Sequence, residues 1–208
     1  MENQIVKVSK QSLTALKWLL RGRRKSDDRP LLQCVYAEKE FLCCVDGFRA
    51  HFMPNFLGLQ DGVWEVGALP ALKANQEGLV EFSPYVSQTF PRMRELCPSV
   101  NGKTPAWEFS FDSKLVVDFF NGTATEIAES VKDMEFSSCY TTTIRGYSNF
   151  EPVEVFGRLQ NTSVEGFPEG IMAYALIMPG HPSHDPVWTP WGMVERVKSG
   201  TVMSYKQS

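Results

Sequence analysis

The residues best suited to chemistry in this chain are basic ones near its start. Six lysines and arginines, with no acidic residue among them, lie between positions 10 and 25: Lys10, Lys17, Arg21, Arg23, Arg24 and Lys25. Four of them recur at steps of seven, four and three, which predicts a narrow stripe along one helix. An ordinary solvated surface is the alternative, but such surfaces usually mix charge signs. On a chain of net charge −3, this basic strip predicts local contact with phosphates while the rest of the chain repels them.

Residue patterns typical of catalysis are weak. His181, His184 and Asp185 could recruit a metal, but Pro182 and the loop setting favour a fortuitous cluster. Other carboxylates are explained by a turn, a helix cap and a helix surface: Asp46, Asp112 and Asp118. No glycine-rich phosphate loop is present, and no nucleophile is paired with a base. We therefore expect a binding protein without cofactor or metal, and a small α+β enzyme with an unidentified site stays as an alternative.

Composition predicts a folded chain of one ordinary domain or two small ones. It has 208 residues, 43% hydrophobic and 22% charged. No apolar run approaches the roughly 20 residues that span a bilayer, and the polar start does not resemble a signal peptide. The five cysteines are odd in number and lack CxxC spacing, which predicts buried thiols. A cytoplasmic location is expected.

The hydrophobic pattern predicts a strand at 4–8 and then a helix capped by Ser9, with Leu13, Leu16 and Leu19 on one face and Gly22 near its end. Further strands are predicted at 31–36, 41–45, 63–66, 79–82, 85–90, 136–144, 153–159 and 171–178. Further helices are predicted at 68–75, within 107–120 and at 123–134. A strand-then-helix unit thus recurs at 5–20, 63–75 and 107–120. We expect one unit over 1–98, a second over 99–181, and a tail over 182–208 whose prolines discourage regular structure until about Gly192.

Residues 31–50 form the centre of this pattern. Two apolar strands are joined by a polar reversal at 38–40, and Asp46-Gly47 then predicts a second sharp turn, because glycine accepts positive φ. Phe48 and Arg49 would be presented on that bend. A plain corner between strands is the alternative.

The bend also carries a resemblance to a known family. Cys-Val-Asp-Gly-Phe-Arg-Ala-His at 44–51 resembles the Ala-Thr-Asp-Gly-(His/Phe/Tyr)-Arg-Leu-Ala motif of the bacterial DNA sliding clamp, the beta subunit of the replicative polymerase. Phe-Pro-Arg-Met-Arg-Glu-Leu-Cys-Pro at 90–98 is similar to the Phe-Pro-Asp-Tyr-Arg-Arg-Val-Ile-Pro that links its last two domains. Ala-Leu-Ile-Met-Pro-Gly-His at 175–181 resembles its Val-Met-Pro-Met-Arg-Leu ending, and 107–122 is similar to a helix start in its last domain.

The resemblance implies a DNA-clamp-like α+β fold of repeated strand–helix–strands units, with sheets outside and helices on an inner face. In the family, three of these motifs converge into a hydrophobic groove for peptide tails of polymerases and the clamp loader. Carried over, the groove would comprise Gly47, Phe48, Arg49, Ala50, Pro91, Leu96, Met178 and Pro179. The chain departs from the family at Glu95, where the family has Arg, and at Gly180-His181, which replaces Met-Arg.

The implied function is that of a DNA polymerase processivity factor. The chain would form an oligomeric ring around duplex DNA, with a trimer favoured by its length, and would contact phosphates through the basic strip without reading sequence. The groove would tether a polymerase or clamp-loader peptide. The alternative with the same fold is an adaptor or decoy that binds such peptides without encircling DNA.

Overall fold

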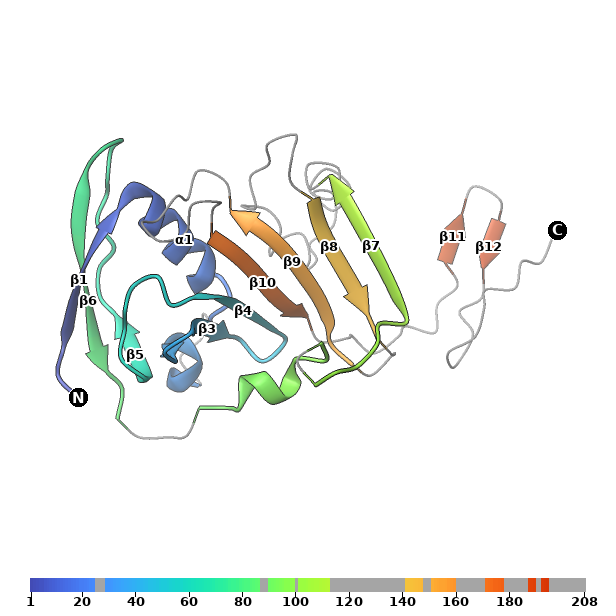
Figure 1. The fold of residues 1–208 in the computed structure, drawn as a ribbon, viewed down its shortest axis with the longest axis horizontal. Helices are drawn as coiled ribbons and strands as arrows, with labels where there is room; N and C mark the ends of the chain where they lie inside the picture. Colours follow the sequence, from blue (N-terminus) through green and yellow to red (C-terminus); the bar gives the residue numbers. More distant parts are fainter. Residues whose placement is uncertain are drawn as a thin grey trace.

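The computed structural model describes residues 1–24, 29–86, 90–99, 101–112, 141–147, 151–159, 171–177, 187–189 and 192–194. They form one ten-stranded sheet, one α-helix, two short 3-10 helices and a separate two-stranded sheet (Figure 1). Every strand pairing among them is antiparallel.

The elements in chain order are β1 (Gln4–Ser9), α1 (Lys10–Leu20), η1 (Pro30–Gln33), β2 (Val35–Ala37), β3 (Phe41–Val45), β4 (Arg49–Pro54), β5 (Gly62–Val66), β6 (Glu77–Pro84), η2 (Met93–Leu96), β7 (Trp107–Asp112), β8 (Thr141–Gly146), β9 (Val153–Leu159), β10 (Ile171–Ile177), β11 (Val187–Thr189) and β12 (Gly192–Val194). The strand order in the large sheet is β1-β6-β5-β2-β3-β4-β10-β9-β8-β7. The pairing of β4 with β10 therefore joins the strands before residue 98 to those after it in one continuous sheet.

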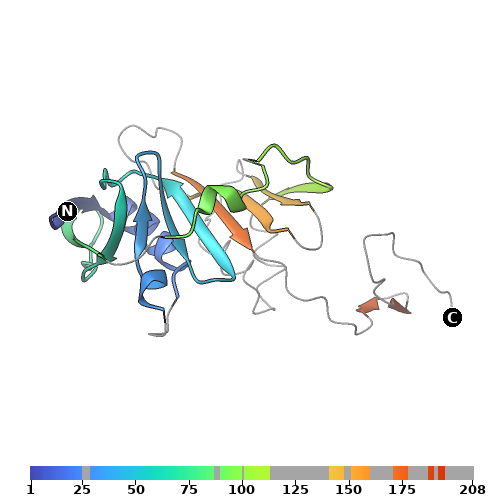
Figure 2. The ribbon, with the colours of Figure 1, turned by 90° about the horizontal axis from the view of Figure 1, so that it is seen from below.

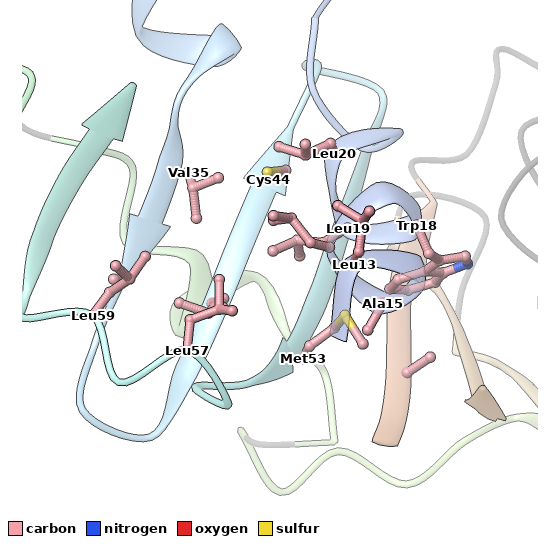
Figure 3. Packing of buried hydrophobic residues seen from close by; sticks show 14 of the residues in the cluster. Leu13, Ala15, Trp18, Leu19, Leu20, Val35, Cys44, Met53, Leu57 and Leu59 are labelled. Carbon is pink, nitrogen blue, oxygen red and sulfur yellow. The ribbon is translucent and has the colours of Figure 1, made fainter. Parts of the chain in front are cut away.

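Helix α1 forms as its sequence predicts. The Ser9 side chain accepts the Ser12 N–H at 3.1 Å and so caps one of the free donors of the first turn. The leucines on one face are buried against strands β1, β3 and β4 (Figure 3). Directly after the helix, a Cβ on Gly22 would lie 2.9 Å from the Cys44 carbonyl oxygen. Glycine is needed there because the chain passes so close to β3.

The two faces of the sheet are covered differently, because neighbouring residues on a strand point to opposite sides. Cys44 and Met53 belong to the core under α1, whereas Cys43 and Phe52 belong to the core on the other face. That second face is covered by residues 90–99, here called the linker, which contains η2. The linker crosses the sheet near β4 and β10 (Figure 2). The Phe90 ring stacks on Tyr36 with 4.7 Å between ring centroids.

The structure confirms the predicted strands at 4–8, 41–45, 63–66, 79–82, 153–159 and 171–178 to within two residues. The helix predicted at 68–75 is wrong, since these residues form no helix and Asn75 has a φ of 60°. Pro70 disfavours helical backbone at Leu69, and a segment this short gains little from helical hydrogen bonds alone. Leu69 and Leu72 instead pack against the core under α1.

Three other predictions need smaller corrections. The strand predicted at 31–36 begins as the 3-10 helix η1, because Pro30 starts a turn closed by the Cys34 N–H on the Leu31 carbonyl. The strand predicted at 85–90 does not form over its described part, since β6 ends at Pro84. The tail carries a short strand β11 at Val187–Thr189, where irregular structure was predicted, and it pairs with β12, which begins at Gly192.

The repeated strand-then-helix unit forms in its first copy, at 5–20, and is wrong for the second copy, at 63–75, where a strand is followed by no helix. The third copy, at 107–120, is described only for its strand β7. Helices predicted within 113–120 and at 123–134 lie outside the described residues, so α1 is the single α-helix in the part of the chain that the structure describes. The division at residue 98 stays a prediction.

Candidate functional site

Residues 46–49, here called the bend, connect β3 to β4 and are organised by one carboxylate. Asp46 Oδ1 accepts the backbone N–H groups of Phe48 and Arg49, each at 2.9 Å. Gly47 takes a φ of 100°, which glycine adopts without strain. The Phe48 side chain is 64% exposed. The bend therefore holds an apolar ring in solvent on a backbone fixed by hydrogen bonds.

Arg49 connects the bend to helix α1. It is only 7% exposed, and its Nε lies 3.0 Å from Asp46 Oδ2. Its Nη2 donates to the Arg21 carbonyl oxygen at 3.2 Å, just past the end of α1. A second bond joins the same two segments, because Arg24 Nη1 donates to the Asp46 carbonyl oxygen at 3.3 Å. The C-terminal end of α1 and the bend are thus joined by two arginines.

Three segments distant in sequence meet beside the bend. In the pairing of β4 with β10, Arg49 lies opposite Ile177 and Ala50 lies opposite Leu176. The end of β10 therefore reaches the start of β4. Met93 and Cys97 of the linker pack in the same apolar cluster as Ala50 and Leu176.

The residues predicted for the groove differ in their accessibility. Phe48 on the bend and Leu96 on the linker are exposed, at 64% and 45%, and Pro91 on the linker is exposed as well. Arg49 and Ala50 are buried, at 7% and 2%. Gly47 supplies the turn itself. Met178 and Pro179 lie outside the described residues.

The linker is fixed at one end by Arg94. Its guanidinium lies 3.2 Å from a Glu38 carboxylate oxygen and 2.6 Å from one of Glu40, both in the turn between β2 and β3. It also lies over the Phe41 ring, 5.0 Å from the centroid. Because Arg94 is half exposed, these contacts place the linker more than they stabilise the fold.

The other end of the linker is fixed by Glu154, a fully buried carboxylate on β9. It accepts the Ser99 N–H at 2.9 Å and the Ser99 hydroxyl at 2.7 Å. The hydroxyls of Tyr147 and Tyr174 donate to it at 2.6 and 2.8 Å. Burial raises the pKa of Glu154, but the hydrogen bonds from Tyr147, Ser99 and Tyr174 together lower that pKa below its ordinary value. The same burial, together with the bond to Glu154, raises the pKa of Tyr147 to about 12.

Sequence reasoning missed this carboxylate. In Val153-Glu154-Val155, alternation of apolar and charged residues predicts that Glu154 faces solvent. It is buried because the linker covers that face of the sheet, and no sequence pattern near Glu154 indicates the covering segment.

The basic strip is divided by the fold. Lys10 and Lys17 are exposed on α1, whose first turn contains no acidic residue. Arg21, Arg23 and Arg24 are half-buried past the helix end. Lys25 lies outside the described residues. The strip thus consists of two open lysines on the helix and arginines that also contact the protein.

A pocket of about 400 Å³ opens beside those arginines. It is lined by Arg23, Arg24, Pro30, Gln33, Cys34, Glu65 and Val66. Burial and the neighbouring Glu65 raise the pKa of the Cys34 thiol to about 11, although Arg23 opposes the shift. Cys34 is therefore a protonated, poor nucleophile at neutral pH.

His51 lies under α1, and contacts with Trp18 explain why a histidine is buried there. Its ring stacks on Trp18 with 4.2 Å between centroids, and its Nδ1 donates to the Trp18 carbonyl oxygen at 3.0 Å. Burial lowers the pKa of His51 to about 4, so the ring is neutral at pH 7. His181, His184 and Asp185 of the possible metal cluster lie outside the described residues.

The sheet, its helix and the junction of β4 with β10 define a DNA sliding-clamp-like fold. The chain is similar to the Helicobacter pylori beta clamp solved in complex with 5-chloroisatin, with a TM-score of 0.53 and 8% identity over 87% of this chain and 67% of that one. The same clamp in complex with carprofen gives the same values. The DNA polymerase III subunit beta of Pseudomonas aeruginosa matches with a TM-score of 0.48 and 10% identity, over 86% and 67% of the two chains.

This likeness is one of fold alone. No protein-family model and no curated protein matches the sequence. Among the described residues, no helix is both long and apolar enough to cross a membrane.

Proposed function

We propose that this chain is a sliding-clamp-like processivity factor that associates into a ring on duplex DNA and tethers partner proteins by short peptides. The proposal combines a clamp-like fold with two surfaces on opposite faces of one sheet. Helix α1 and the exposed Lys10 and Lys17 lie on one face. Val45 and Ala50, which flank the bend, pack with Met93 and Cys97 of the linker on the other face. The observation that best supports the proposal is the pairing of β4 with β10, because it sets Ile177, at the end of β10, opposite Arg49.

The DNA-binding part of the proposal rests on Lys10 and Lys17. Both side chains are exposed on a helix without acidic residues in its first turn. Two such charges would contact backbone phosphates and release counterions, so binding would be independent of sequence and steeply salt-dependent. The half-buried Arg21, Arg23 and Arg24 and the undescribed Lys25 would extend this surface.

The peptide-binding part rests on the exposed Phe48 of the bend and the exposed Leu96 and Pro91 of the linker, with Gly47, Met178 and Pro179 proposed to complete the groove. Exposed apolar residues held on fixed backbone are suited to anchor a short apolar peptide. Arg49 and Ala50 would support the groove from below, since both are buried.

DNA binding is tested with a Lys10→Glu/Lys17→Glu variant on a linear duplex. Both side chains are exposed, so folding should be unchanged, while affinity should fall at least about tenfold and the salt slope should decrease by about 1 for each lost phosphate contact. A Lys39→Glu/Lys73→Glu variant carries the same charge change at two exposed loop positions outside α1 and β1. Unchanged binding in the first variant would refute the assignment of α1.

Peptide binding is tested with a labelled C-terminal tail peptide of a bacterial replicative polymerase. Phe48→Ala should weaken binding about tenfold or more, as loss of an interface anchor does. Val86→Ala is the control, because Val86 is an apolar side chain outside the predicted groove and is even more exposed than Phe48. An equal effect of both variants would contradict the groove.

The two experiments also separate the alternative with the same fold. A chain that binds the peptide and shows no affinity for duplex DNA would be an adaptor or decoy for clamp-binding peptides.

A further inference from the structure

We propose that Arg49 is a positioning residue that couples the two surfaces, so that the state of helix α1 controls how firmly the bend holds Phe48. The link between DNA binding and peptide binding rests on the proposed function. The role of Arg49 in fixing the bend rests on contacts within this chain.

The coupling is a closed set of contacts between the bend and the end of α1. Arg49 bonds both the Asp46 side chain and the Arg21 carbonyl, at 3.0 and 3.2 Å. Arg24 bonds the Asp46 carbonyl at 3.3 Å. Asp46 is therefore held from the helix side through its backbone and from β4 through its carboxylate.

The same carboxylate determines the conformation of the bend. Asp46 Oδ1 accepts the N–H groups of Phe48 and Arg49, while Oδ2 accepts the Arg49 side chain. If the end of α1 moves, Arg49 must lose either its bond to Arg21 or its bond to Asp46. In the second case the amides of Phe48 and Arg49 lose the orientation of their acceptor, and Phe48 is released from its fixed position.

Arginine is required at position 49 because one side chain must donate in two directions. Its planar guanidinium presents Nε to Asp46 and Nη2 to the Arg21 carbonyl, at a site only 7% exposed. A lysine would keep the charge and the pairing with Asp46, but its single ammonium does not reproduce the fork. Arg49→Lys therefore separates the charge of this residue from its bridging role.

The direct test is amide hydrogen exchange at Phe48 and Arg49 in the full-length chain. Arg24→Gln removes a contact that reaches the bend from the helix side, and Arg49→Lys alters the bridge. Each should speed exchange at these two amides about tenfold, the change expected from losing one charge-assisted hydrogen bond, with strand amides of β9 unchanged. Arg145→Gln is the matched control, because it removes an arginine that pairs with Glu108 elsewhere in the sheet. It should leave both amides as in the wild type.

Two results would overturn the coupling. Exchange at Phe48 and Arg49 could stay unchanged in both variants, or it could rise equally across the whole sheet, which would mean general destabilisation. A third arm adds linear duplex DNA. The DNA should slow exchange at the two amides in the wild type and in Arg145→Gln, and should not do so in Arg49→Lys.

The DNA arm distinguishes failure of the inference from failure of the proposed function. DNA that binds without changing the two amides in the wild type would overturn the coupling. A wild-type chain that does not bind DNA would overturn the proposed function, while the comparison of Arg24→Gln with Arg145→Gln would still decide whether Arg49 and its contacts position the bend.

Discussion

His51 and Glu154 are both fully buried ionisable residues. Both should lower the free energy of unfolding as the pH falls. The folded protein holds His51 neutral and Glu154 as a carboxylate. The unfolded chain binds protons at both residues more readily as the pH falls. At this scale, the two residues make the fold most stable near neutral pH.

His51 should make stability depend on pH between about 6.5 and 4. Its pKa is about 4 in the folded protein against an ordinary 6.5, so its contribution is complete above pH 6.5 and is lost as the pH falls toward 4. At about 1.4 kcal/mol per pKa unit, the loss is about 3 kcal/mol in total. Urea unfolding followed by tryptophan fluorescence measures it. In His51→Asn, which keeps a donor near the position of Nδ1, the pH dependence between 6.5 and 5 should decrease, and an unchanged slope would contradict this account.

Removing the Glu154 side chain should destabilise the protein much more than replacing its carboxylate with a neutral amide. Glu154→Ala leaves the donors of Ser99, Tyr147 and Tyr174 without a buried acceptor, and we expect a loss of about 3–5 kcal/mol. Glu154→Gln keeps one oxygen, and the Tyr147 hydroxyl can rotate to accept from the new amide, so its loss should be about 1–2 kcal/mol. Because the pKa of Glu154 is lowered, the difference between Glu154→Gln and the wild type should shrink as the pH falls below about 4.5.

The measurement for Glu154 is the unfolding free energy from urea titrations at several pH values. Equal losses in the two variants would contradict the proposed network, since the acceptor oxygen that Gln keeps and Ala lacks would then contribute nothing.

At the scale of elements, α1 connects local sequence to both proposed surfaces. Its apolar face is fixed by packing on the sheet, its lysines lie on the open side, and its C-terminal end contacts the bend. The linker covers the other face of the sheet, where it is held through Arg94 and through the bonds of Ser99 to Glu154.

The Ser9 hydroxyl that caps α1 should contribute more to the stability of the protein than the Thr14 hydroxyl on the same helix. Ser9→Ala removes the acceptor of the Ser12 N–H and should destabilise the protein by about 1 kcal/mol. Thr14→Ala is the control on the same helix. The Thr14 hydroxyl bonds only the Lys10 carbonyl at an exposed position, and alanine is the better helix former, so its effect should be neutral or slightly stabilising. Thermal unfolding measures both, and a larger effect of Thr14→Ala would contradict the capping role.

At the scale of the whole molecule, the large sheet ends in strands β1 and β7, each with one paired neighbour among the described residues. Open edges of this kind are sites where another chain can pair. Near the β1 edge, Ile5 and Leu79 are 67% and 63% exposed on adjacent strands. This edge is therefore suited to contact a second copy of the chain, as ring formation requires.

The expected assembly is an oligomer at micromolar concentration, with a trimer favoured. Light scattering should give that mass for the wild type, and an Ile5→Glu/Leu79→Glu variant should shift the mass toward the monomer without loss of folding, because both side chains are exposed. Val86→Glu is the matched control, being 82% exposed beyond the end of β6. A wild type that stays monomeric with and without DNA would count against the ring.

Residue patterns in the sequence were enough to predict the local structure around α1 and the bend. Ser9, the leucine spacing and Asp46-Gly47 act through neighbours a few residues away, so their consequences can be read from adjacent residues. The order of the three family-like motifs also indicated which segments should meet. The helix predicted at 68–75 failed because Leu69 and Leu72 reach the core under α1 from an irregular segment, which a short periodic pattern does not reveal.

The tertiary structure alone decided what each candidate residue can do. It buried Arg49 and Ala50, left Phe48 exposed, and divided the basic strip into open lysines and half-buried arginines. It also covered Glu154 with the linker, 55 residues away in sequence. Burial and hydrogen-bond partners depend on which distant segments cover a side chain, and here that follows from the pairing of β4 with β10, which no local pattern specifies.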